Sequence, residues 1–171
     1  VSSGAMMAGQ LHYAHSANVK YEAIFAGAPY YCAINNLTNA TNCMLGVFAQ
    51  PLSFLESSTR QFASSGLIDP VQNLSGSKGY YFSGSNDHVV ATSSVRATAQ
   101  MLRVFGGTTT ENYATNAGHT WPTPDGPNPC PNTGPNWMNN CGIDPERTFL
   151  SEFFGTLNPR NAGRLNGRLI N

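Results

Sequence analysis

The chain has 171 residues, a formal net charge of zero and 11% charged residues, against roughly 25% in an average soluble protein. This length is sufficient for one domain with a real hydrophobic core, and the charge balance provides neither a basic surface for nucleic acid nor an acidic field for cations. No apolar run approaches the ~18 residues of a membrane span. We therefore expect a neutral, poorly soluble or polymeric substrate, with no nucleic acid and no membrane as partner.

The hydrophobic pattern predicts alternating strands and helices. Helical spacing of apolar residues predicts helices over residues 3–16, 51–65, 92–105 and 145–157. Apolar and aromatic runs predict strands over residues 22–29, 78–83 and 111–117. Residues 122–145 are dense in Pro, Asn and Gly and are expected to form a loop. The alternation predicts an α/β chain, with residues 1–171 as a single domain.

The first residues form a candidate nucleophile turn. A glycine before Val1 would make Val1-Ser2-Ser3-Gly4 the G-x-S-x-G motif, in which a sharp strand-to-helix turn presents a serine. Ser2 centres the motif and is our candidate nucleophile, because Ser3 would have Ala5 in place of the last glycine. We expect Ser3 to give its backbone N–H to an oxyanion hole. The preceding strand is expected upstream of Val1, and a simple helix cap is the structural alternative.

Two further motifs follow predicted strands. Asp87 ends the motif Gly-Ser-Asn-Asp and can stabilise an imidazolium, and His119 in Gly-His-Thr-Trp-Pro can act as a general base. Serine, aspartate, histidine is the chain order of α/β-hydrolases. The structural alternatives are an Asx turn at Asp87 and a structural loop role for His119. His12, His15 and His88 are expected to be solvated, and no metal or cofactor is implied.

Cysteines and sequons indicate an oxidising environment. The cysteines are Cys32, Cys43, Cys130 and Cys141. Three disulfide connectivities exist, of which we favour the two local ones, 32 with 43 and 130 with 141, because each closes a short loop. A zinc site is the competing interpretation, but the chain has no C-x-x-C. Asn36, Asn39 and Asn73 begin sequons and are candidate glycosylation sites. We therefore expect a secreted, extracellular protein.

Together these motifs resemble the secreted polyhydroxybutyrate depolymerases and the related acetylxylan and feruloyl esterases. The likeness rests on residues 1–8, 25–32, 84–87 and 118–122. It is strongest for the fungal single-domain depolymerases, whose α/β-hydrolase fold is circularly permuted. The resemblance implies a nucleophile near the N-terminus and further strands after the histidine, with residues 155–167 leading into that second half.

The chain also departs from this family pattern. A His-Gly-Cys-type turn that completes the oxyanion hole and an aromatic-rich substrate wall are not found, nor are the strands that would flank the serine. We therefore expect a truncated portion of the sheet, incomplete at both ends, with a companion segment as partner. The resemblance gives Trp121 a role in lining the acyl-binding cleft; packing within its own loop is the structural alternative.

The sequence thus predicts a secreted serine esterase of the α/β-hydrolase fold. It would hydrolyse poly(3-hydroxybutyrate) or a similar polyester through Ser2, His119 and Asp87, with an acyl-enzyme intermediate. One alternative is an esterase that acts on acetyl or feruloyl groups of plant cell walls. A second is a non-catalytic secreted binding module or an inactive hydrolase fragment, which the missing oxyanion segment favours.

Overall fold

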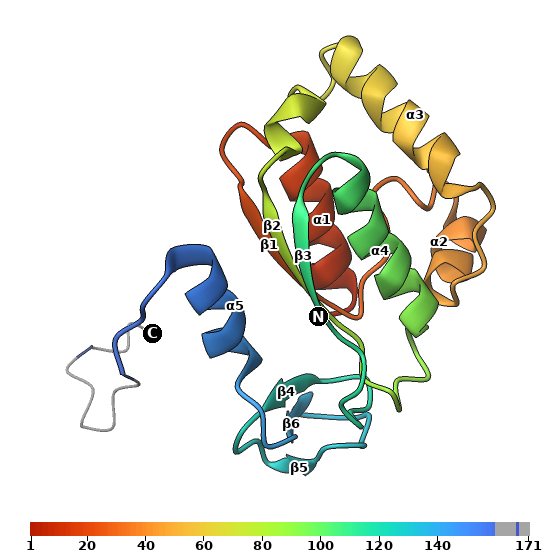
Figure 1. Ribbon diagram of the computed structural model, residues 1–171. Coiled ribbons are helices and arrows are strands. Elements are labelled where there is room, and N and C mark those ends of the chain that lie inside the picture. Colours follow the sequence, from red (N-terminus) through yellow and green to blue (C-terminus); the bar gives the residue numbers. More distant parts are fainter. Residues whose placement is uncertain (160–166, 168–171) are drawn as a thin grey trace.

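A three-stranded parallel sheet lies at the centre of the computed structural model, which describes residues 1–159 and residue 167 (Figure 1). Its strands are β1 (Tyr21–Phe25), β2 (Lys78–Phe82) and β3 (Thr108–Asn112), in the order β1-β2-β3. Phe25 is in register with Phe82, and Phe82 with Asn112. Because the strands are parallel, their carboxyl ends share one edge of the sheet, where catalytic groups of open α/β folds gather.

Helices cover both faces of this sheet. They are α1 (Ser3–Ala14), α2 (Leu37–Met44), α3 (Leu52–Ser64), the 3-10 turn η1 (Val71–Leu74), α4 (Thr92–Val104) and α5 (Pro145–Phe154). Helices α1 and α4 pack on one face and α5 on the other (Figure 1). The α/β architecture predicted from the sequence is confirmed, with helices at the four predicted places. Over the residues that the structure describes, no helix is long and apolar enough to cross a membrane.

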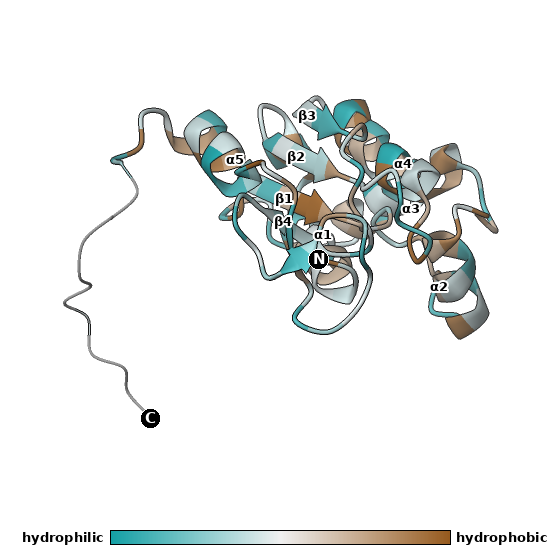
Figure 2. Cartoon of the chain, turned by 90° about the horizontal axis from the view of Figure 1, so that it is seen from below, coloured by the Kyte–Doolittle hydropathy of each residue, from teal (hydrophilic) through white to brown (hydrophobic). Residues whose placement is uncertain are grey.

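Each face of the sheet buries its own hydrophobic cluster, because successive strand residues point to opposite sides. Ile24 and Tyr81, both fully buried, belong to the cluster under α1 and α4. Phe25 and Phe82 belong to the opposite cluster, which Phe153 of α5 joins. The carboxyl end of β1 is apolar and β3 is hydrophilic (Figure 2). The core is therefore concentrated around the two strands that lead to the candidate site.

Three expectations about strands and loops differ from the structure. The third strand lies at Thr108–Asn112 rather than at residues 111–117, because three β-branched threonines directly after the glycine turn favour an extended chain. Residues 122–145 are not all loop. They contribute to a small parallel sheet of β4 (Trp121–Thr123), β6 (Met138–Asn140) and β5 (Asn128–Pro129), in that order. The third difference is smaller: β1 ends at Phe25 rather than at residue 29.

Both disulfides join the locally paired cysteines, 32 with 43 and 130 with 141. The short loop between Cys32 and Cys43 includes most of α2, which Asn36 caps by accepting a hydrogen bond from the Asn39 N–H at 3.0 Å. Asn36 is exposed, whereas Asn39 and Asn73 are half-buried. Glycosylation at these three residues remains a prediction.

The expectation that His12 is solvated is wrong. His12 is 0% exposed, and its Nε2 lies 3.2 Å from Ser77 Oγ. Its Nδ1 lies 3.1 Å from Glu22 Oε2, close enough for an ion pair but outside hydrogen-bond geometry. The other Glu22 oxygen accepts a hydrogen bond from the Tyr81 hydroxyl. Burial, followed by the nearby Glu22 carboxylate, raises the pKa of Tyr81 well above its ordinary value, so the phenol stays the donor in this buried polar cluster.

Candidate active site

Ser2 occupies a left-handed turn at the start of α1. Its φ is 57° and its ψ is −128°, a conformation that costs a non-glycine residue about 1–3 kcal/mol and occurs often at active sites. The Ser2 N–H donates to the Phe25 carbonyl at 2.9 Å, which fixes the turn to the carboxyl end of β1. Ser2 is the N-cap residue, yet its side chain makes no capping hydrogen bond. The helix-cap alternative is therefore contradicted, because Ser2 Oγ does not cap the helix.

Asp87 and His119 form a buried pair beyond the ends of β2 and β3. His119 Nδ1 lies 2.9 Å from Asp87 Oδ2, and the two side chains are 7% and 1% exposed. The Asx-turn alternative also holds, because the other oxygen, Oδ1, accepts hydrogen bonds from the N–H groups of Val89 and Val90 at 2.8 and 2.9 Å. A carboxylate accepts the Nδ1 proton, so the tautomer inferred for neutral His119 leaves Nε2 as a base.

The hydrogen bonds at Asp87 decide its protonation state. Burial alone would raise the pKa of this carboxyl, but the bonds from His119, Val90 and Val89 favour the charged form and hold the pKa below its ordinary value. Asp87 is therefore ionised at neutral pH, and it can stabilise positive charge on the imidazole that it contacts.

Two glycines allow close backbone contacts around the Asp87 and His119 loops. A Cβ on Gly84 would lie 2.0 Å from the Ala117 carbonyl oxygen, and one on Gly118 would lie 2.3 Å from the Asn132 carbonyl oxygen. The Asn86 N–H donates to the same Ala117 carbonyl at 3.0 Å. A side chain at Gly84 would separate the Asp87 loop from the His119 loop, and a side chain at Gly118 would separate the His119 loop from the segment after Cys130.

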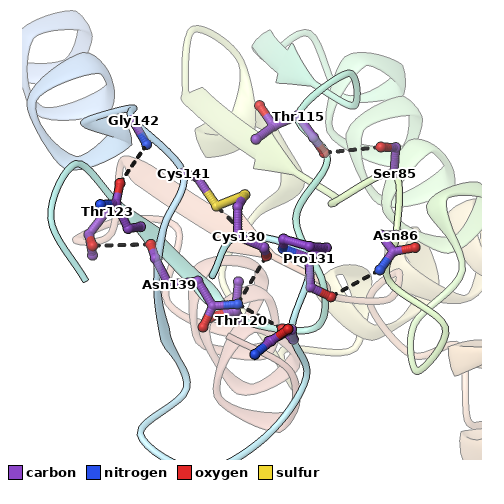
Figure 3. Close-up of a disulfide and its surroundings, with 12 residues drawn as sticks. Ser85, Asn86, Thr115, Thr120, Thr123, Cys130, Pro131, Asn139, Cys141 and Gly142 are labelled. Carbon is purple, nitrogen blue, oxygen red and sulfur yellow. Dashed lines mark hydrogen bonds between the residues drawn. A yellow bond between two sulfur atoms is a disulfide. The ribbon is translucent and has the colours of Figure 1, made fainter. Parts of the chain in front are cut away.

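The segment after Cys130 is hydrogen-bonded to both loops, and Figure 3 shows its contact with Asn86. Asn86 is the residue before Asp87, and its side-chain amide donates to the Pro131 carbonyl at 2.9 Å. The Gly118 N–H donates to the Cys130 carbonyl at 3.0 Å, and the His119 N–H donates to Thr133 Oγ1 at 2.9 Å. Sequence reasoning missed these supporting residues, because their contacts join segments far apart in the chain. The only local signal was the cysteine pair around the loop.

The polypeptide around Ser2 also lies near the histidine loop. Val1 packs against the hydrophobic cluster that contains Phe25, and Trp121 packs against the same cluster. The rings of Phe25 and Trp121 are 4.3 Å apart between centroids. The structure thus brings Asp87 and His119 into contact and places Ser2 at the same sheet edge. Among the described residues, no hydrogen bond joins Ser2 Oγ to His119.

The two remaining predicted residues have different surroundings. The N–H of Ser3, the first residue of α1, finds no acceptor among the described residues, so it is free to bind an anion. Trp121 is half-buried against Phe25, and its Nε1–H donates to Glu146 of α5. The side chain of Trp121 therefore packs against β1 and α5, which lie outside its own loop, and its role in lining the acyl-binding cleft stays a prediction. His15 and His88 are exposed, as expected.

Sequence comparison finds relatives along nearly the whole chain. A poly(3-hydroxybutyrate) depolymerase of Delftia acidovorans is 40% identical over 169 residues, which are 96% of this chain and 34% of the relative. A polyhydroxybutyrate depolymerase of Talaromyces funiculosus is 33% identical over 99% of this chain and 51% of the relative. The chain thus spans about one third and one half of these two relatives. No family model matches it.

Solved structures agree with the sequence relatives. The crystal structure of PHB depolymerase from Penicillium funiculosum has a TM-score of 0.83 and 30% identity, covering 98% of this chain and 54% of that one. A variant PHB depolymerase complexed with an R3HB trimer has the same TM-score, 29% identity and the same coverage. Residues 160–166, within the segment expected to lead into a second half of the fold, lie outside the described residues.

Proposed function

The chain is homologous to the polyhydroxybutyrate depolymerases and has their α/β-hydrolase type of fold over almost all its length, and from this premise we propose that it carries the catalytic triad of a polyester-hydrolysing serine esterase. The observation that carries the proposal is the buried contact of 2.9 Å between His119 Nδ1 and Asp87 Oδ2, at the sheet edge where Ser2 is held in a left-handed turn. The relatives named above support a polyester such as poly(3-hydroxybutyrate) as the substrate.

In this mechanism Ser2 Oγ attacks the ester carbonyl while His119 Nε2 takes its proton. Ionised Asp87 stabilises the imidazolium, and the free N–H of Ser3 donates to the oxyanion of the tetrahedral intermediate. His119 then protonates the leaving alcohol, and an acyl-enzyme remains on Ser2. His119 takes a proton from the water molecule that attacks the acyl-enzyme and gives it to Ser2 Oγ as the acid leaves, which regenerates both residues. Catalytic hydrogen bonds of free enzymes often shorten only when substrate binds. We therefore expect the hydrogen bond between Ser2 Oγ and His119 Nε2 to form in the complex with the ester substrate.

The nucleophile is tested by fluorophosphonate labelling, which needs an activated serine. We expect the protein to label covalently at Ser2 and the Ser2→Ala variant not to label. Ser3→Ala is the matched control, because it removes the neighbouring hydroxyl but keeps the backbone N–H, and it should still label. Labelling of Ser2→Ala at the wild-type rate would refute Ser2 as nucleophile, and loss of labelling only in Ser3→Ala would transfer the role to Ser3.

The substrate class is tested separately, with the protein in its natural full length. We expect release of soluble acid from emulsified poly(3-hydroxybutyrate) and little release of acetate from acetylated xylan. Activity on xylan alone would favour the cell-wall esterase. The two disulfides and the fungal relative support an extracellular site of action, where such a polymer would be met.

A further inference from the structure

An apolar cavity of about 260 Å³ opens beside the start of α1. It is lined by Met6, Gln10, Ala28, Pro29, Tyr31, Cys32, Ala33, Ile34, Asn35, Ala40 and Cys43. These residues come from α1, from the chain that follows β1, and from α2. None of the described lining residues carries a charge. The cavity is therefore suited to an uncharged group.

The walls of this cavity are continuous with the two elements that hold Ser2. Met6 of the lining donates its N–H to the Ser2 carbonyl at 3.0 Å, so the cavity begins one helical turn from the candidate nucleophile. Phe25, which accepts the Ser2 N–H, lies three residues before Ala28 of the lining. A group bound here would thus lie beside the serine turn, at the carboxyl edge of the sheet.

The outer wall is held in an unusual backbone conformation. Tyr31, Ile34 and Asn35 have φ values of 60°, 42° and 57°, in the left-handed region that disfavours side chains with a Cβ. The Cys32–Cys43 disulfide ties this segment to α2, and the ring of Tyr31 packs edge-on against Phe62 at 4.8 Å between centroids. Strained conformations persist where the surroundings enforce them, and they concentrate at ligand sites.

We propose that this cavity binds the acyl chain of the ester that Ser2 attacks, and that it thereby sets the preferred acyl length. The proposal rests on the esterase function proposed above. The volume exceeds the roughly 150 Å³ of an apolar cavity that holds benzene, so a neutral acyl chain larger than acetyl fits. Gln10 and Asn35 are lining residues whose amides form no side-chain hydrogen bond within the described residues. These amides are available to the oxygens of a hydroxyacyl unit, in keeping with a mainly apolar site that has a few polar groups.

The test measures kcat/KM of the full-length protein on p-nitrophenyl esters from acetate to octanoate. Ala40→Leu fills the cavity from α2 with three extra carbons. Each methylene kept out of an apolar site costs about fourfold, so we expect octanoate hydrolysis to fall at least tenfold while acetate hydrolysis stays within twofold. Ala49→Leu is the matched control, because Ala49 is exposed and outside the lining, and it should change neither. Equal effects of Ala40→Leu on both esters, or no effect, would overturn the proposal.

A binding measurement separates this proposal from the triad. Hexanamide is neutral and is not an ester, so calorimetry with the Ser2→Ala protein reports on the cavity without chemistry. We expect hexanamide to bind Ser2→Ala as it binds wild type, and binding to fall at least tenfold when Ala40→Leu is added. If Ala40→Leu does not fold, Ile34→Ala enlarges the cavity and should move the preferred ester towards longer chains. Hexanamide binding unaffected by either change would refute the cavity assignment, even if Ser2 proves to be the nucleophile.

Discussion

The two oxygens of Asp87 have separate partners, so this turn residue is also able to take the role that we propose for it in the triad. Oδ1 satisfies the N–H groups of Val89 and Val90, while Oδ2 faces His119. Asp87→Asn should keep the turn but present an amide to His119, which favours the wrong imidazole tautomer. We expect kcat on a soluble ester to fall about 10³–10⁴-fold, with the fold intact by circular dichroism. Wild-type kcat in this variant would exclude Asp87 from the triad.

The lowered pKa of Asp87 also links stability to pH. A carboxyl whose folded pKa lies below its unfolded value contributes stability that is present above the unfolded value, about 3.9, and is lost as pH falls through the folded pKa. The free energy of unfolding of wild type minus that of Asp87→Asn should therefore be constant from about pH 5 to 7 and shrink below about pH 4. Urea unfolding across this range measures it, and a difference that grows with acid would contradict the assignment.

The two disulfides allow a comparison between loops of equal length. Each joins cysteines 11 residues apart, so chain entropy predicts a similar loss, about 2–3 kcal/mol, when either is removed. The loop after Cys130 holds His119 and Asn86, whereas the Cys32–Cys43 loop forms the cavity wall. Replacing Cys130 and Cys141 by serine should lower kcat on an acetate ester at least tenfold, because small displacements of catalytic groups are costly.

The matched variant replaces Cys32 and Cys43 by serine, measured at a temperature where both proteins are folded. It should leave acetate turnover within about threefold of wild type and should weaken the preference for longer acyl chains. If both variants lose the same stability and the same kcat, the second disulfide has no special connection with the histidine loop.

The contact between His12 and Glu22 joins α1 to β1 away from solvent. Removing one member of a buried polar contact leaves the other group without a partner in the core, and such changes cost about 1–3 kcal/mol or more. We expect His12→Leu and Glu22→Met each to destabilise strongly in urea unfolding, and the double variant to lose at least about 1 kcal/mol less than the sum. Glu22→Gln is the conservative control, because its amide oxygen can still accept the Tyr81 hydroxyl. Strict additivity would show that the two side chains do not interact.

At the scale of the whole molecule, zero net charge and few ionisable residues predict that encounters with a neutral polyester do not depend on long-range electrostatics. Raising ionic strength from about 0.01 to 0.5 M shortens the Debye length several-fold. The initial rate on a poly(3-hydroxybutyrate) film should therefore change by less than about twofold over this range. A steep fall with added salt would reveal a charged surface that directs adsorption, contrary to this expectation.

The sequence predicted those helices and strands that depend on residues close together in the chain. The helix expected over residues 145–157 is present as α5, which Pro145 begins and which Asp144 caps by accepting the Arg147 N–H. The contact between Asp87 and His119 joins residues 32 apart, but both follow parallel strands, so the topology made it predictable. The burial of His12 was not predictable, because its partners Glu22 and Ser77 come from other elements. The short strands β4, β5 and β6 were missed because their Pro and Asn content opposes the usual strand signal.

The backbone contacts at Gly84 and Gly118 have a consequence for directed evolution of the substrate range, because they identify positions that should not be varied. At both glycines a backbone carbonyl oxygen occupies the place that a Cβ would take. Repacking of neighbouring side chains therefore cannot accommodate a substitution there. Library members that carry such a substitution are expected to have a displaced His119 loop. Ala33 and Ala40 belong to a cavity wall instead. Diversity placed at those two codons samples pocket shape while the catalytic loops keep their spacing.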